Sequence, residues 1–142
     1  MSENPYQSPA AADRVVGVLM ANANYLTERH LTAAGVLPGS NYVIGDAMSG
    51  LACEEFDHLW TGGLRTDPPS ADYRKAEREF IAVATRFVSQ HPDMAALVLE
   101  CTGFPPFARA LQREIDMPIF SWGTLLDFAW SIAVHRDYYG HV

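Results

Sequence analysis

Short runs of apolar residues alternate along the chain with longer segments in which apolar residues recur every three or four positions. Four of the runs predict strands, at residues 14–20, 41–45, 96–99 and 117–120. The run at 96–99 is apolar without interruption, which is typical of a parallel strand buried on both faces. Strands that alternate with helices predict an α/β fold: a single three-layer, flavodoxin-like domain with a parallel sheet of about four strands and right-handed crossovers.

Helical spacing fills the segments between the strands. A first helix is expected over residues 26–34, where Gly35 ends it, and a brief helix over residues 50–60 carries Cys53. The longest helix follows a predicted cap at Ser70, and we interpret its charge run as solvated surface. Its expected core residues are Tyr73, Ala76, Phe80, Ile81, Ala84, Phe87 and Val88, and its expected solvent-facing residues are Asp72, Arg74, Lys75, Glu77, Arg78 and Glu79.

The chain of 142 residues is long enough for one domain. Residues 1–13, with two prolines among small and polar residues, predict a flexible leader, and residues 14–142 the α/β domain. A net charge of −7 argues against a nucleic-acid or anionic-membrane partner. The sequence has neither an apolar run of the roughly 20 residues that span a bilayer nor a signal-peptide core, so we expect a cytoplasmic protein.

Candidate chemistry lies at Cys101, Thr102 and Gly103, between the strand at 96–99 and a helix that the Pro105-Pro106 pair begins. Backbone amides and the positive end of a helix dipole stabilise a thiolate, so Cys101 is expected to titrate below an ordinary thiol while a carboxylate binds beside it. Thr102 would supply a hydroxyl donor, and Gly103 would let the backbone approach a ligand. The alternative is that Cys101 only packs, as free cysteines often do.

The first strand is followed by two asparagines, Asn22 and Asn24, at a predicted strand-to-helix turn. Either side chain could donate to a ligand, but we favour capping of the following helix. Two cysteines, Cys53 and Cys101, form neither a metal-ligand set nor a disulfide framework, so both are expected to be reduced thiols and no metal site is predicted.

Residues 98–108 and 117–125 resemble the aspartate/glutamate/hydantoin racemase family, with weaker similarity at residues 16–36. The resemblance covers the carboxy-terminal half of that two-domain family, and the domain would then be equivalent to one half of such an enzyme. Family members often have asparagine where this chain has Gly103, and aspartate where it has Ser121.

The resemblance implies a cofactor-independent racemase or isomerase that acts on a small carboxylate or amino acid similar to aspartate or glutamate. In such enzymes two cysteines, one in each half, face each other, and one removes the Cα proton while the other returns it. Cys101 would be the second of these, with Thr102 as a donor to the substrate carboxylate. The sole lysine, Lys75, lies in the charge run, which argues separately against pyridoxal chemistry.

The second cysteine of that mechanism must come from elsewhere. A homodimer could set two copies of Cys101 across one cleft, or a complementary half could supply the other thiol, whereas Cys53 matches no family cysteine. A predicted last helix over residues 124–138 is more apolar than a surface helix needs, which favours association of some kind. One alternative is a catalytically inactive carboxylate-binding or interaction domain. Another is a cysteine hydrolase, but no histidine stands at a spacing that predicts a catalytic Cys/His pair.

Overall fold

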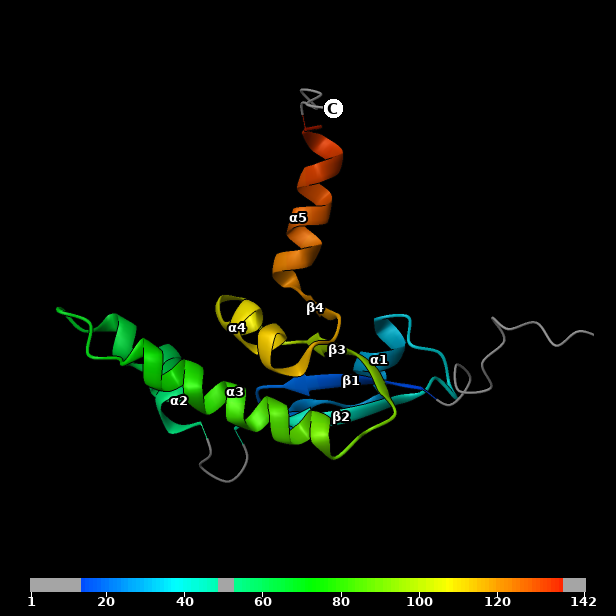
Figure 1. The fold of residues 1–142 in the computed structure, drawn as a ribbon, viewed down its shortest axis with the longest axis horizontal. Helices are drawn as coiled ribbons and strands as arrows, with labels where there is room; N and C mark the ends of the chain where they lie inside the picture. The colour runs from blue at the N-terminus through cyan, green and yellow to red at the C-terminus, as the bar shows by residue number, and fades with distance from the viewer. Residues whose placement is uncertain (1–13, 49–52, 137–142) are drawn as a thin grey trace, which may run out of the picture.

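The sheet of the computed structural model, which describes residues 14–48 and 53–136, has four parallel strands. These are β1 (Val15–Met20), β2 (Tyr42–Asp46), β3 (Met94–Leu99) and β4 (Ile119–Ser121), in the order β2-β1-β3-β4. The predicted single α/β domain with a four-stranded parallel sheet is confirmed (Figure 1). The predicted leader lies outside the described residues, as do residues 50–52 of the predicted brief helix and residues 137–138 of the predicted final helix. The final helix ends at Ala133, so the prediction that it continues through residues 134–136 is wrong.

One face of the sheet is covered by three helices: α2 (Glu54–Thr61), α3 (Tyr73–Ser89) and α4 (Pro105–Ile115). Leu19, Leu97 and Leu99 point into this core, where each is almost fully buried. The buried α3 residues that had been expected in the core are Ala76, Phe80, Ala84 and Phe87, while Tyr73 is exposed. Phe56, Phe80, Phe104 and Phe107 pack together between the three helices, and the rings of Phe80 and Phe104 stack at 4.6 Å.

Two helix boundaries differ from the sequence-based expectation. Helix α3 begins at Tyr73 rather than near Ser70, because the Asp72 carboxylate accepts a hydrogen bond from Lys75 N at 2.9 Å and forms the cap. Glu79, expected to face water, turns toward α2 and accepts hydrogen bonds from Glu55 N at 2.8 Å and Phe56 N at 3.4 Å. Its carboxylate satisfies amides that the start of α2 would otherwise leave unpaired.

Among residues 14–48 and 53–136, the opposite face of the sheet carries one α-helix, α1 (Glu28–Ala33), which has no buried residue and is followed by Gly35 with a φ of +83°. Parallel sheets bury both faces as a rule. Here Val16 is exposed and Val18 and Val98 are only partly buried, so much of this face is uncovered. We call it the open face and define it by Val16, Val18, Ile44, Val98 and Phe120.

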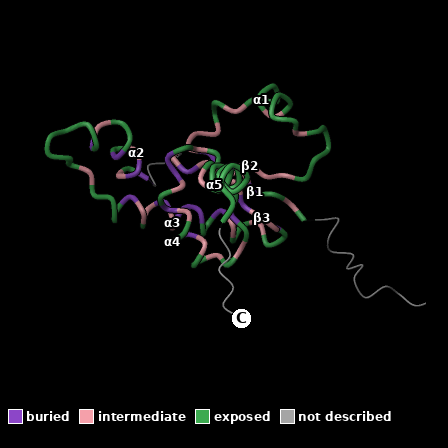
Figure 2. Tube along the Cα trace, turned by 90° about the horizontal axis from the view of Figure 1, so that it is seen from above, coloured by how far each residue is buried: buried purple, intermediate pink, exposed green. Residues whose placement is uncertain are grey.

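The last helix, α5 (Trp122–Ala133), projects from the β4 edge of the sheet and stands apart from the other helices (Figure 1). No residue of α5 is buried. Viewed from above, the helix is exposed along its whole described length, whereas the buried residues gather beside it (Figure 2).

Candidate functional site

Cys101 lies in the turn between β3 and α4, as the sequence predicted. The turn is closed by a hydrogen bond from Phe104 N to the Cys101 carbonyl oxygen at 3.1 Å. Gly103 N donates to Cys101 Sγ at 3.4 Å, and the thiol is half-buried. Because Phe104 is buried in the aromatic core, the core positions the Cys101 turn as well as stabilising the fold.

The expected lowering of the Cys101 pKa is wrong for this chain. Burial raises the pKa of the thiol; the hydrogen bond from Gly103 N lowers it, and the charge of Glu100 raises it. Burial is the largest cause, and the sequence of α4 does little to oppose it, because its first two residues are Pro105 and Pro106 and neither has an N–H. The helix start therefore offers the sulfur fewer amide donors than an ordinary helix N-terminus.

The loop after β1 lies next to the Cys101 turn, since Glu100 N donates to the Leu19 carbonyl oxygen at 3.0 Å across the strand ends. In this loop Asn22 caps a short 3-10 helix, η2 (Ala23–Tyr25), by accepting from Asn24 N at 3.0 Å. Asn22 does act as a cap, but it caps η2 and not the predicted helix, since α1 begins at Glu28 with Thr27 as its N-cap residue; Asn24 is exposed. Thr102 is also exposed, at the rim of the same strand ends.

The sequence reading missed Asp46, the last residue of β2. Its carboxylate accepts hydrogen bonds from Ala23 N at 2.8 Å and Met48 N at 2.9 Å, so it ties the loop after β1 to the end of β2. A carboxylate directly after an apolar run was the available signal, because carboxyl ends of parallel strands gather at one edge of a sheet. Asp46 thus orders the loop that holds Asn22 beside the Cys101 turn.

The end of β4 closes the other side of the site. Trp122 Nε1 donates to the Glu100 carbonyl oxygen at 3.0 Å. Ser121, which differs from the residue common in the racemase family, caps α5: its hydroxyl accepts from Thr124 N, and Thr124 Oγ1 in turn accepts from Ser121 N at 2.9 Å. Ser121 therefore has a structural role at this position, because it is the N-cap residue of α5.

Gly103 is buried under the indole of Trp60 rather than open to a ligand, which corrects the role expected for it. A Cβ at this position would lie 2.9 Å from Trp60 Nε1. Any side chain here must displace the indole, so the glycine allows Trp60 to lie against the Cys101 turn.

We expect Gly103→Ala to destabilise the fold by about 1–3 kcal/mol, because overpacking forces neighbouring side chains to shift. The measurement is chemical denaturation together with tryptophan fluorescence, which should report the displaced Trp60. Gly62→Ala is the matched control, since its Cβ would come no closer than 3.9 Å to His58 Nδ1. In a Trp60→Ala background, where the indole is absent, Gly103→Ala should lower the free energy of unfolding by less than it does in the wild type. An equal loss of stability in both backgrounds would contradict the contact between Gly103 and Trp60.

Cys53 stands at the N-cap position of α2 and is only 2% exposed. Burial raises the pKa of its thiol to about 11, with a further rise from Glu79 and an opposing effect of Arg86. A thiol enclosed in the core in this way is a packing residue and does not serve as a second base beside Cys101.

The raised pKa of Cys53 predicts a loss of stability in alkali. The folded state holds the proton more tightly than the unfolded state, so the stabilisation is complete below the ordinary thiol pKa and is lost as the pH rises toward about 11. We expect the free energy of unfolding of the wild type to fall across this range by about 2–3 kcal/mol more than that of Cys53→Ala. Urea denaturation at a series of pH values measures this, and parallel pH profiles of the two proteins would contradict it.

Within the part of the chain that the structure describes, no group of three or more histidine, cysteine, aspartate or glutamate side chains is arranged to hold a metal ion. In the same described ranges, no helix combines the length and the apolar character that crossing a membrane requires.

Two characterised proteins match parts of the chain. Dimethylsulfoniopropionate lyase 5 of Emiliania huxleyi (strain CCMP1516) is 29% identical over 93 residues, which are 63% of this chain and 17% of that protein. A dimethylsulfoniopropionate lyase of Durusdinium sp. clade D is 28% identical over 57 residues, which are 40% of this chain and 19% of that protein. The chain thus spans about a fifth of the length of these relatives.

No family model matches the chain, and no solved structure does. The similarity to the two lyases nevertheless agrees with the resemblance that the sequence motifs carry. The chain is distantly similar to dimethylsulfoniopropionate lyases, which are members of the aspartate/glutamate racemase superfamily.

Proposed function

We propose that this domain removes a proton from the carbon atom next to the carboxylate of a small substrate, with the Cys101 thiolate as the base. The observation that carries the proposal is the position of Cys101 at the carboxyl end of the central strand β3, directly before α4. Open α/β sheets bind ligands at this edge. Thr102, exposed at the same rim, is proposed to donate to the substrate carboxylate, with Asn22 and Asn24 on the neighbouring loop.

Racemisation and elimination share this first step. In racemisation, a second acid must return a proton to the same carbon from the opposite side. In elimination, the electron pair of the broken C–H bond forms a double bond to the next carbon, and the leaving group departs with its own bonding pair. The lyase names of the two relatives fit the second course, which needs one base rather than two.

The number of thiols in the described residues therefore bears on the reaction. Cys101 is half-buried at the strand ends, whereas Cys53 is enclosed in the core. One chain thus offers one sulfur base for elimination. A racemase would need its second cysteine from another copy of the chain or from a complementary half.

A positive charge on the substrate would favour the thiolate form of Cys101. The pKa of Cys101 is raised mainly by burial, so the thiol form dominates near neutral pH in the free protein. A positive charge close to the sulfur favours the thiolate. Dimethylsulfoniopropionate carries a sulfonium and amino acids carry an ammonium group, so either class of substrate would lower the pKa of Cys101 on binding.

Product analysis tests the proposal. The purified chain is incubated separately with dimethylsulfoniopropionate, L-aspartate and L-glutamate; dimethylsulfide and acrylate are measured for the first, and chiral chromatography is applied to the other two. Release of dimethylsulfide would support elimination, and D-enantiomers would support racemisation. Turnover of none of the three, with the chain shown to be folded by circular dichroism, would count against the proposal.

A second candidate is a carboxylate-binding domain without catalysis; it is favoured by the half-buried position of Cys101, since burial raises the pKa of the thiol and so opposes formation of the thiolate. Calorimetric titration with the same three ligands separates the two functions. A binding domain would take up a ligand without turnover, and its affinity would be the same in Cys101→Ser.

A further inference from the structure

Helix α5 is apolar over most of its surface. Its polar residues Thr124, Asp127 and Ser131 are spaced three and four apart, so they share one narrow stripe. The six large apolar side chains occupy the rest of the helix and are all exposed: Trp122, Leu125, Leu126, Phe128, Trp130 and Ile132. A broad exposed apolar surface marks a contact with protein or membrane, and at 12 residues α5 is too short to span a bilayer. The apolar part of the helix is therefore expected to be covered by protein.

The open face of the sheet is apolar in the same way. The pairing registers place Ile44, Val18, Val98 and Phe120 in one row across all four strands. Phe120, in the edge strand β4, is 55% exposed. A row of this kind is the surface on which the helices of an α/β protein normally pack.

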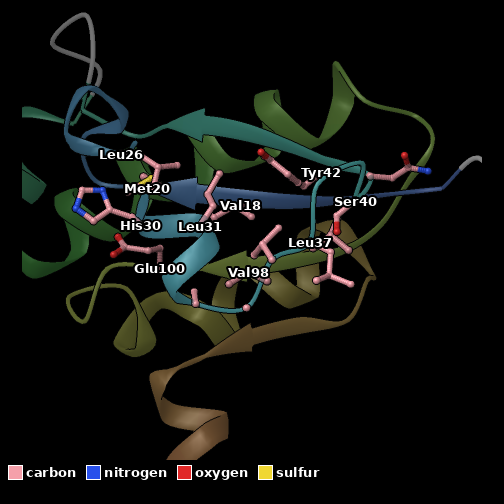
Figure 3. A pocket seen from close by; sticks show the side chains of 15 residues that line it. Val18, Met20, Leu26, His30, Leu31, Leu37, Ser40, Tyr42, Val98 and Glu100 are labelled. Atoms are coloured by element: carbon pink, nitrogen blue, oxygen red, sulfur yellow. The ribbon is translucent and has the colours of Figure 1, made fainter. Parts of the chain in front are cut away.

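Between the open face and α1 lies a groove of about 620 Å³, which we define by Val18, Leu26, Leu31, Leu37 and Val98 (Figure 3). Glu100 lines one end of it, one residue before Cys101. The helix and the sheet match in length, because 12 residues of helix span about 18 Å and the six residues of β1 span about 20 Å. The chain thus presents an exposed apolar helix and an apolar sheet face of similar length.

The two surfaces of one copy are kept apart by the junction between β4 and α5. The helix begins at Trp122, directly after the last residue of β4, so no linker allows it to turn back. Ser121 and Thr124 cap the helix reciprocally, and Trp122 Nε1 is held by the Glu100 carbonyl oxygen. These bonds fix α5 in the projecting direction seen in Figure 1.

We propose that two copies of this chain form a dimer by exchanging α5, each helix packing on the open face of the other copy. Exchange of identical helices covers α5 and the open face of both copies at once, and it gives a closed dimer with twofold symmetry. The exposed apolar area of each helix is roughly 500 Å², from about 200 Å² for a buried aromatic side chain and about 100 Å² for an aliphatic one. The two helices alone supply roughly 1,000 Å², the size at which specific interfaces begin.

The exchange places the partner's helix along a groove that ends at Glu100, beside the Cys101 turn. The proposal does not rest on the proposed function, because it concerns assembly and is tested by mass and by crosslinking. A catalytically inactive chain would form the same dimer.

Sedimentation equilibrium of the full chain measures the assembly. We expect a mass twice the 15.7 kDa of one chain. Leu126→Glu is expected to raise the dissociation constant at least about a hundredfold, because a charge replaces a buried leucine in both contacts of the dimer. The matched control is Leu64→Glu, at another exposed leucine that lies outside α5 and the groove, and it should leave the dimer intact. A monomeric wild type, or equal effects of the two substitutions, would overturn the proposal.

Disulfide trapping distinguishes the exchange from other dimers and from helices that fold back. All variants are made in a Cys101→Ser background. One set of chains carries a single cysteine at one of residues 125–130, so that every side of α5 is sampled. A second, isotope-labelled chain carries Val16→Cys. The exchange predicts disulfides between labelled and unlabelled chains at positions three or four residues apart. A chain that carries both cysteines tests whether the helix folds back on its own sheet. Disulfides that form only within that chain, or a dimer in which no disulfide forms between the labelled and unlabelled chains, would overturn the exchange.

Discussion

Replacing Cys101 by serine is expected to lower turnover of the carboxylate substrate by about 10² to 10⁴-fold, the usual contribution of a positioned acid or base. Serine keeps the size of the side chain but is far too weak an acid to supply an anionic base at neutral pH. The folded state should persist, because Cys101 is half-buried in a turn and its sulfur accepts one hydrogen bond, from Gly103 N at 3.4 Å.

Cys53→Ala is the matched control, because it removes the other thiol of the chain, which is buried at the start of α2. Initial rates of the two variants and the wild type, at the same concentration of folded protein, make the comparison. A Cys101→Ser enzyme as active as the wild type would mean that another group removes the proton.

The same rates should rise with pH. Burial raises the pKa of the Cys101 thiol, so the thiolate fraction grows through the alkaline range rather than near neutrality. If a cationic substrate favours the thiolate, the rise in kcat should lie at lower pH than the rise in kcat/KM, because kcat reports the complex and kcat/KM the free enzyme. Profiles of the two parameters that coincide would contradict that effect of the substrate.

Phe80→Ala has the second largest expected effect, a loss of about 3–5 kcal/mol in the free energy of unfolding. The ring is fully buried, stacks on Phe104 at 4.6 Å and also lies against Phe56. Truncation leaves a cavity that three neighbouring helices cannot close. Since Phe104 begins the helix after Cys101, the loss should also loosen the site.

Urea denaturation measures this loss, and Thr85→Ala, at an exposed position of the same helix, is the control with an expected change of less than about 0.5 kcal/mol. Alkylation of Cys101 in the folded protein should be faster in Phe80→Ala than in Thr85→Ala. A loss below about 1 kcal/mol would contradict the packing described between α2, α3 and α4.

The strands and their parallel order could be predicted from the sequence, because each apolar run reports the burial of its own residues. The place of Cys101 followed from the same pattern. Its pKa did not, because that depends on how deeply the turn is buried and on which amides reach the sulfur. In the sequence, Pro105 and Pro106 indicate a helix start, but their missing N–H groups also weaken that start as an anion site.

Contacts between distant segments account for the other differences. Glu79 lies in a charge run that reads as surface, yet its carboxylate caps α2 from another helix. Gly103 reads as room for a ligand, yet the space above it is filled by Trp60. The apolar character of the last helix was visible in the sequence, whereas the matching open face required the sheet registers that pair Val98 with Phe120.

The most direct test of the account is proton NMR of the full chain in heavy water, with the signal of the hydrogen on the carbon next to the carboxylate followed over time. Dimethylsulfoniopropionate, L-aspartate and L-glutamate are each examined beside Cys101→Ser. We expect the signal of at least one substrate to be lost, by exchange or by elimination, only when Cys101 is present. A signal that persists with all three, or that is lost equally with Cys101→Ser, would contradict a thiolate that breaks this C–H bond.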